Sequence, residues 1–327
     1  MIMKRTLLRY FLPVMALFAA TACDNDDSPV RSGADNPVPD ENFTPVWTHL
    51  YESGTPAAGS VFIGDSYTGV NGTSGIHDVP QLYVGAVYPG RNFPTALKYS
   101  DIIEVPKRSA VLTAGLGSVD SFSGESEGLT SLSYAGFMKN LLASSAYSDF
   151  IREKGWTRLD YALCDVRTVG NLSRLFPDNG LFARGMAEVV SETPGLATAK
   201  SLTVGRVVMQ SLTVGMDVPA GGVFADPQQV PADAVCVSSL TYGATAYFVI
   251  VSDRSYDEVC ACFKEGDVAA AFDTPSGKLR NSTIITFIIR YDSRNADVAT
   301  TFSSLTDFLA SPFTPTSCGY PIYIKSL

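Results

Sequence analysis

The feature that most constrains this chain is a long alternation of side chains from Ser201 to Asp217. The positions of one parity are Leu202, Val204, Arg206, Val208, Gln210, Leu212, Val214 and Met216. The other parity is mostly Ser, Thr and Gly. A period of two predicts a β-strand with one apolar face and one wet face. It is also the pattern of a membrane strand, which needs about 9–11 residues.

Other β-branched and aromatic runs, bounded by turn-forming residues, predict strands at 61–63, 82–84, 109–112, 246–251 and 283–289. Apolar residues at helical spacing predict a helix over 131–155, stopped by Gly155, and a short helix over 257–265. Together these elements predict an α+β fold with a large, mainly antiparallel sheet.

Residues 295–311 fit two secondary structures. The helical stripe consists of Val298, Phe302, Leu305 and Leu309. At period two, Val298, Phe302 and Phe308 share one face, and Leu305 and Leu309 are the exceptions. A segment that changes from a packed helix into a barrel strand requires this double pattern, because only closed barrels let strands cross lipid. Short amphipathic segments also fit both periods by chance.

Residues 1–22 are expected to be a signal peptide. A basic start, a short apolar stretch and small residues precede Cys23, as in bacterial lipoproteins cleaved before this cysteine and acylated on it. An ordinary signal peptide with an incidental cysteine is the alternative. The acidic run at 24–27 resembles the export signal of some surface lipoproteins, and a solvated linker is the other interpretation. We expect an outer-membrane lipoprotein, exposed at the cell surface if that run is a signal.

Residues 23–55 are interpreted as the lipidated cysteine and a flexible tether, and residues 56–327 as the folded core, which holds no apolar stretch long enough for a membrane helix. The formal net charge is −9, and without the signal peptide 21 basic residues face 33 acidic ones, or −12. This balance argues against nucleic acid and against adsorption on anionic lipid. Acylation would then supply the membrane attachment.

Five cysteines follow Cys23, an odd number that excludes complete disulfide pairing within one chain. Cys260 and Cys262 lie two positions apart on an expected helix, so they point in different directions. No histidine lies near them to complete a zinc site. We expect core residues rather than metal ligands.

Residues 62–66 resemble the nucleophile block of GDS-type esterases. Such enzymes need a base, usually a histidine near the C-terminus. No histidine follows His77, which is too close to Ser66 in sequence for a dyad. We therefore expect no enzyme activity, no cofactor and no metal.

A series of short motifs lies in a fixed order between about Tyr83 and Leu327. They are Ala86-Val87-Tyr88-Pro89-Gly90, Pro106-Lys107-Arg108, Ala114-Gly115-Leu116, Arg158 to Phe176, Leu212 to Pro219, Val223 to Asp226, Ser238 to Tyr247, Asp257 to Lys264 and Tyr320-Pro321-Ile322. Each motif is weak alone, but the ordered set resembles the core of the cholesterol-dependent cytolysins, the thiol-activated pore-forming toxins.

This resemblance implies a bent central sheet flanked by helical clusters that unfurl into two amphipathic hairpins per subunit, with many subunits closing a barrel. By position, the hairpins lie near 180–217 and 283–312. The candidate membrane residues are Leu202, Val204, Val208, Leu212, Val214, Val298, Phe302 and Phe308. Tyr242 and Gly243 are expected at a strand end near the subunit-pairing edge, where glycine permits positive φ and close approach. An ordinary turn is the alternative there.

Two departures from the family pattern weaken the pore interpretation. The toxins continue past the position of Leu327 into a Trp-rich membrane-recognition domain, so we do not expect this chain, with two tryptophans, to bind cholesterol directly. Arg290 and Tyr291 replace a glycine pair that the family uses as a hinge. Shortened bacterial relatives can act as half of a two-component pore. We expect a homo-oligomer, an assembly with a longer cytolysin-like partner, or both.

Two functions without membrane insertion stay open. A cytolysin-like lipoprotein could capture a glycan, a lipid or a protein, or it could join a toxin oligomer and block it. Arg206 and Gln210 on the apolar face, Pro194 and the changed hinge favour these functions. The clean alternation at 296–310 favours insertion.

Overall fold

The computed structural model describes residues 40–64, 82–94, 97, 99–117, 121–177, 180–263, 277–289, 297–299, 303–310 and 313–327. The predictions for Cys23, Ser66, Phe302, Arg290 and Tyr291 fall outside these residues. Within them, no helix is both long enough and apolar enough to span a membrane.

The strands are β1 Trp47–Glu52, β2 Val61–Phe62, β3 Val87–Pro89, β4 Ala110–Gly115, β5 Ser121–Ser126, β6 Arg158–Asp165, β7 Ser201–Met216, β8 Ala234–Ser252, β9 Thr283–Ile289, β10 Asp297–Ala299 and β11 Tyr320–Ser326. The helices are α2 Ser131–Leu142, α3 Ser145–Glu153, α4 Leu172–Leu175, α5 Gly180–Ser191, α6 Tyr256–Phe263 and α8 Ser303–Ala310. The predicted strands at 201–216 and 283–289 are confirmed.

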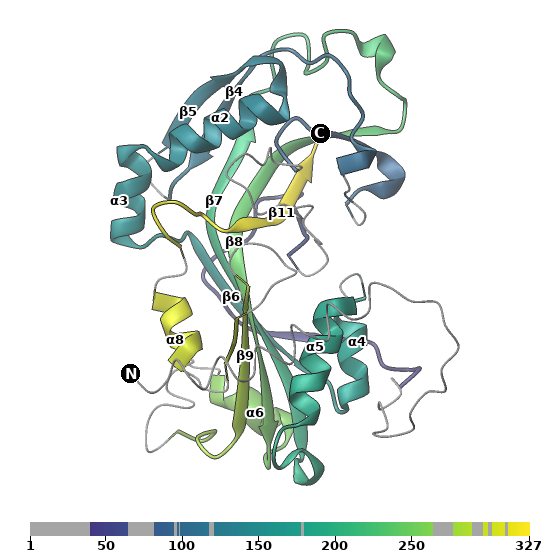
Figure 1. The fold of residues 1–327 in the computed structure, drawn as a ribbon, viewed down its shortest axis with the longest axis vertical. Helices are drawn as coiled ribbons and strands as arrows, with labels where there is room; N and C mark the ends of the chain where they lie inside the picture. The colour runs from purple at the N-terminus through teal and green to yellow at the C-terminus, as the bar shows by residue number, and fades with distance from the viewer. Residues whose placement is uncertain are drawn as a thin grey trace, which may run out of the picture.

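The two longest strands, β7 and β8, form an antiparallel ribbon that runs the length of the molecule (Figure 1). In the lower half, β6 pairs with β7, and β9 pairs with β8. In the upper half, β4 takes the place of β6, and β11 takes the place of β9. All these ladders are antiparallel, which confirms the predicted α+β fold with a bent, mainly antiparallel sheet.

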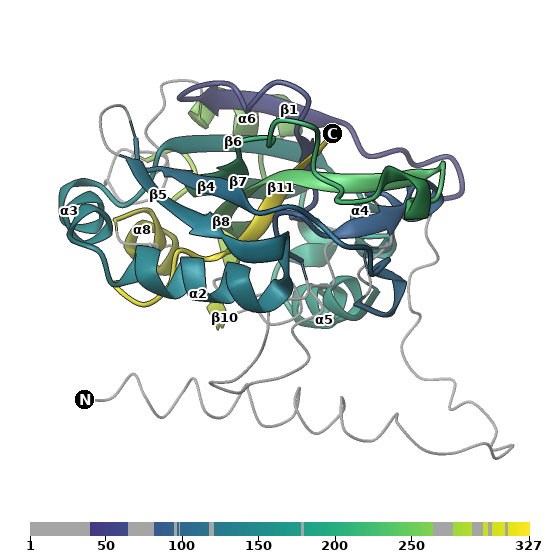
Figure 2. The same cartoon turned by 90° about the horizontal axis from the view of Figure 1, so that it is seen from above.

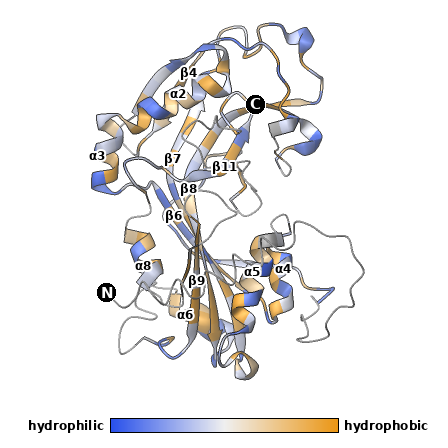
Figure 3. Cartoon of the chain, viewed as in Figure 1, coloured by the Kyte–Doolittle hydropathy of each residue, from blue (hydrophilic) through white to orange (hydrophobic). Residues whose placement is uncertain are grey.

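Helices cover both faces of the lower half. α4 and α5 bury Phe176, Phe182 and Met186 in one core, together with Val204 and Val208 of β7. α6 and α8 belong to a second core, which contains Val207 and Met209 from the other face of β7. Figure 2 shows α5 and α6 on opposite sides of the sheet, and Figure 3 shows much of α5 and β9 in apolar colours. The predicted wet face is therefore wrong from Ser201 to Ser211, where it is buried, whereas Thr213 and Gly215 are partly exposed and Asp217 is exposed.

Several local predictions need correction. The helix predicted over 131–155 is two helices, because Ser144 caps α3 by accepting a hydrogen bond from the Tyr147 backbone N–H. Residues 82–84 form no strand, and a nearby strand, β3, starts at Val87. The predicted tether over 23–55 is too long, since β1 pairs with β6 and belongs to the sheet.

Candidate functional site

The waist of the molecule, where both long strands change partners, is built around Gly243. On β7, the ladder with β6 ends at Gln210 and the ladder with β4 begins at Thr213, with a β-bulge between them. On β8, Gly243 pairs with Tyr320 of β11, whereas Thr245 pairs with Ile289 of β9. Bulges bend and twist a strand, so the sheet bends where its neighbours are exchanged.

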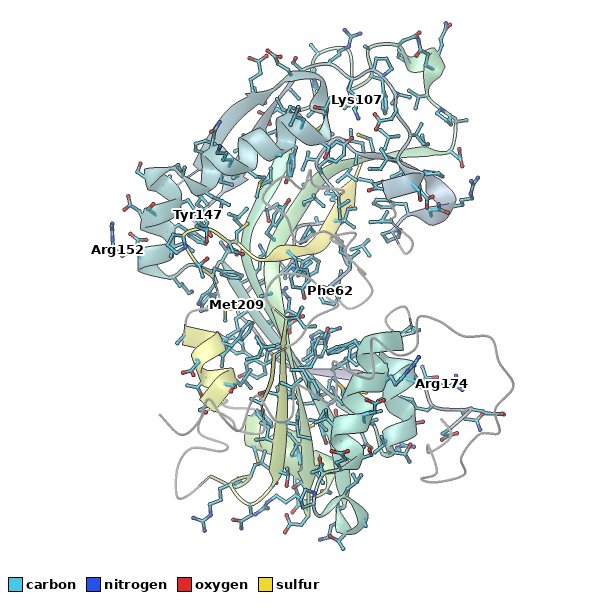
Figure 4. All side chains as sticks on the ribbon, viewed as in Figure 1. Phe62, Lys107, Tyr147, Arg152, Arg174 and Met209 are labelled. Atoms are coloured by element: carbon cyan, nitrogen blue, oxygen red, sulfur yellow. The ribbon has the colours of Figure 1, made fainter. Side chains whose placement is uncertain are left out.

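Gly243 is fixed by close approach rather than by its backbone conformation. A Cβ atom there would overlap the Met209 carbonyl oxygen and the Ile322 side chain. Gly243 is not one of the glycines with a positive φ. Figure 4 shows Met209 near the waist. The prediction of a strand end at Tyr242 and Gly243 is wrong, because both lie inside β8 with partners on each side. The expected close approach of the glycine backbone is confirmed.

Tyr242 ties the waist to the upper helices. Its hydroxyl lies 2.9 Å from the hydroxyl of Tyr134 on α2, and both rings are buried. Burial raises the pKa of Tyr134, so the phenol stays a neutral hydrogen-bonding group. α2 is itself fixed by a capping box between Thr130 and Ser133.

An aromatic cluster docks α4 and α5 on one face of the lower sheet. Tyr247 of β8 meets Phe176 edge to face at 5.0 Å and Phe182 at 5.4 Å. Phe182 also meets Phe287 of β9 at 6.0 Å. Each such pair contributes about 0.5–1.5 kcal/mol beyond its buried area. The Tyr247 hydroxyl is buried without a hydrogen-bond partner, so it adds no polar contact to this aromatic packing.

The next residue of β8, Phe248, docks α6 on the opposite face. Its ring fills the space that a side chain at Gly205 would need, and it lies 5.9 Å from the ring of Phe263. α6 starts at a capping pair, in which the backbone and hydroxyl groups of Ser255 donate to Glu258 at 2.9 and 3.0 Å. These bonds hold the pKa of Glu258 below its usual value. Neighbouring residues of β8 thus anchor opposite helical clusters.

Most of the residues predicted to face lipid lie in strands of the folded sheet. Leu202, Val204, Val208, Leu212 and Val214 are buried in β7. Val298 lies on β10 and Phe308 is buried in α8, so residues 295–311 are not one continuous helix. A period of two marks β7 correctly as a strand but does not distinguish a core strand from a membrane strand.

The connectivity gives other positions for helical segments that could extend the sheet. Residues 166–200 join β6 to β7, and residues 253–282 join β8 to β9. Each segment links two neighbouring antiparallel strands, at the same end of the sheet. Residues 283–312, by contrast, contain β9 itself and a connection that leaves from the waist. The sequence prediction missed 253–282, although it had located α6.

Both outer edges of the lower sheet are covered. β10 pairs with β9 over three residues. β1 pairs with β6 from Trp47 to Glu52, with an irregularity after His49.

A group of possible metal ligands lies at the β1–β6 edge, where His49, Glu52 and Asp160 have ligand atoms within 4.8 Å of one another. However, Nη2 of the buried Arg158 lies 3.3 Å from Glu52 and 3.5 Å from Asp160. This guanidinium already pairs with both carboxylates. The group therefore fits an ion-pair cluster better than a metal centre.

The cysteines of the described residues are free thiols. Burial raises the pKa of Cys236 to about 11 and that of Cys318 to about 12, which keeps both thiols protonated at neutral pH. On α6, Cys260 is buried and Cys262 is partly exposed. The two thiols therefore point in different directions, as predicted.

Comparison with solved structures identifies the class of fold. The pneumolysin structure at 1.98 Å resolution matches with a TM-score of 0.55 at 17% identity, over 88% of this chain and 65% of pneumolysin. The cytotoxin suilysin from Streptococcus suis gives 0.58 at 14%, over 86% and 60%. Listeriolysin O gives 0.55 at 14%, over 86% and 58%. The chain thus spans about three fifths of the length of these toxins.

No family model and no curated protein matches the sequence. The structural neighbours are cholesterol-dependent cytolysins, and the chain has the fold of their core. The predicted resemblance is confirmed at the level of the fold. The neighbours are pore-forming toxins rather than enzymes.

Proposed function

We propose that this protein is a subunit of a pore-forming assembly, in which residues 166–200 leave the sheet face and extend β6 and β7 as a membrane hairpin. The observation that carries the proposal is the charge pattern of this segment in the β6–β7 register. Asp165 pairs with Thr203, so continuing the ladder places residues of equal parity on the same face of both new strands.

In residues 166–200, six of the seven charged residues stand at even-numbered positions; the exception is Arg167. An extended hairpin would therefore have one charged face and one nearly uncharged face, as a barrel strand between water and lipid requires. The same residues also suit the packed helix, because Phe182, Met186 and Val190 lie one turn apart and are buried. In an extended strand these three side chains would share the even-numbered face with the charged residues, and the odd-numbered face would present Ala183, Gly185, Ala187 and Val189.

The length of the segment also fits. Two strands of about 9–11 residues with a turn cross the hydrocarbon core, and residues 166–200 are 35 in number. An extended ribbon pairs its own backbone groups, which is essential in lipid.

Lateral assembly would follow from the strand directions. In the lower half, β6 and β9 are the outer neighbours of the long strands β7 and β8. They run in opposite directions because three antiparallel ladders separate them. β9 of one copy can therefore pair antiparallel with β6 of the next once β10 and β1 move. Acylation at Cys23, attachment to the outer membrane and a longer cytolysin-like partner belong to the same proposal and rest on the sequence resemblance.

A second candidate is a binding or blocking protein that does not insert. It is favoured by residues 253–282, whose ten charged residues divide equally between the two parities. An extended hairpin of residues 253–282 would therefore carry charges on both faces, unlike one of residues 166–200. Such a hairpin is costly to insert, because a Lys or Arg at the bilayer midplane costs about 2–4 kcal/mol.

The test places a polarity-sensitive dye singly at positions 183–189 in a Cys262→Ser background, with bacterial membranes and the longest cytolysin-like protein of the same genome. We expect blue shifts at 183, 185, 187 and 189 but not at 184 and 188, together with release of a trapped dye. A helical pattern that no membrane or partner changes would instead support the second candidate.

A further inference from the structure

The N-terminal strap, defined as residues 40–54, holds the proposed moving parts together. β1 lies within it and covers the outer edge of β6, with Trp47 opposite Cys164 and Glu52 opposite Asp160. β1 is an edge strand with four of its six residues exposed. The other two, Trp47 and Leu50, are partly buried against the two cores, so release of β1 would uncover these contacts but no fully buried side chain of β1.

The strap also contacts both helical segments near their starts. The Asp40 backbone N–H donates to the side-chain oxygen of Asn171, which belongs to residues 166–200, at 2.8 Å. The hydroxyl of Tyr256, the first residue of α6, donates to Thr48 at 2.9 Å. The strap therefore contacts both helical segments as well as the β6 edge, which is proposed to pair with a second copy.

Charged and aromatic contacts hold the strap on the sheet. Arg158 donates to the Gly54 carbonyl oxygen at 2.7 Å and lies 3.3 Å from Glu52. The Arg206 guanidinium lies 4.5 Å from the centre of the Trp47 ring. Partly exposed ion pairs are worth little each, so the strap is held by several weak contacts that can be lost together.

We infer that the strap is a removable cap, which occupies the β6 edge that β9 of a second copy needs and clasps both helical segments until it is released. This inference rests on the proposed function. It adds a step before assembly and assigns the chain next to the expected membrane anchor to that step.

The test uses the Cα pairing of Trp47 with the native Cys164. Directly opposed residues of an antiparallel ladder have suitable spacing for a disulfide. In the full chain, Trp47→Cys oxidised with diamide would lock the strap, and Trp47→Ser treated in the same way is the matched control. Glu52→Gln, at an exposed position, provides a second variant with a loosened strap.

Assembly is followed by analytical ultracentrifugation with vesicles of phosphatidylethanolamine and phosphatidylglycerol and the longer partner. We expect no oligomer from the locked variant, recovery with dithiothreitol, and faster assembly of Glu52→Gln. Equal assembly of the locked and reduced variants would overturn the inference and leave the proposed function intact.

If neither form assembles, hydrogen exchange of β6 decides between the two ideas. Exchange that rises at Arg158–Asp165 in the reduced variant only would support strap release and contradict the pore proposal. Protection that stays unchanged in both forms would overturn the strap inference.

Discussion

The two halves of the molecule share β7 and β8 but treat their buried hydroxyl groups differently. In the upper half and at the waist most of these groups are paired: Tyr134 with Tyr242, Thr213 with Thr241, Ser238 with the Lys325 carbonyl and Thr245 with Tyr320. Ser211, in the β-bulge of the waist, is buried without a partner. In the lower half, the hydroxyls of Ser201, Thr203, Tyr247 and Thr306 are buried without a partner. Exceptions include Ser252, which is bonded to Ser282, and Thr286, which donates to the Ala299 carbonyl oxygen at 3.3 Å.

An unpaired buried hydroxyl costs about 1–3 kcal/mol. Most of the unpaired hydroxyls named above lie in the lower half, so the lower half carries more of this cost than the upper half and the waist. Specific polar contacts fix the upper half as a frame. Apolar and aromatic packing holds the lower half, and that packing can be exchanged for other apolar surroundings. We therefore expect the lower half, rather than the upper half, to be the part that rearranges.

The largest loss of stability is expected from a substitution that disrupts the waist. Gly243→Val would push a side chain into the Met209 carbonyl oxygen and Ile322, and we expect a loss of about 4 kcal/mol or more. Urea unfolding measures it. Gly136→Ala on α2, where a Cβ meets open space, is the matched control and should stabilise by about 0.5–1 kcal/mol. Equal effects of the two substitutions would contradict the account.

The next largest effects come from removing one buried ring in each half, and they test whether the halves unfold independently. Phe263→Ala removes a buried ring from α6 and should cost about 3–4 kcal/mol, expressed as local opening of the lower half. Phe137→Ala removes a comparable ring from α2 and should destabilise the whole frame. Hydrogen exchange resolves the two outcomes. Faster exchange in both halves for Phe263→Ala would show that the halves are not independent.

Two substitutions that each remove one hydroxyl group test the contrast between the lower and the upper half. Tyr247→Phe deletes an unpaired buried hydroxyl, so we expect about 1 kcal/mol of added stability and slower pore formation. Tyr134→Phe deletes one side of a 2.9 Å bond and should cost about 1 kcal/mol. Thermal unfolding of both variants checks the opposite signs, and a loss in both would remove the proposed contrast.

The smallest effect is a difference in thiol reactivity at pH 8. Cys236 and Cys318 have pKa values raised to about 11 and about 12, so little thiolate exists below those values. We expect a disulfide reagent to label Cys262 first, and Cys260 as well in Phe263→Ala. Early labelling of Cys236 or Cys318 would show that the frame opens with the lower half.

The sequence predicted the long strand at 201–216 because alternation is a local property. It did not predict that both faces are buried, since alternation along one strand does not show which helices pack on it: α5 precedes β7 directly and covers one face, whereas α6 comes from after β8 and covers the other. The strand β1 was missed because the tether, which is polar and rich in proline up to Thr44, was extended to residue 55, although Trp47, Thr48 and Tyr51 favour a strand. The hairpin was placed on β7 because core and membrane strands share a period, and only the observed register between Asp165 and Thr203 shows which segment continues the ladder.

The central claim is that residues 166–200 refold while the upper half stays fixed. Time-resolved hydrogen exchange during assembly on a permeabilised bacterial membrane tests it most directly. We expect residues 172–191 to lose protection and later to regain it as a strand, with α2 and β11 unchanged throughout. Pores that form while residues 172–191 stay protected as a helix would contradict it.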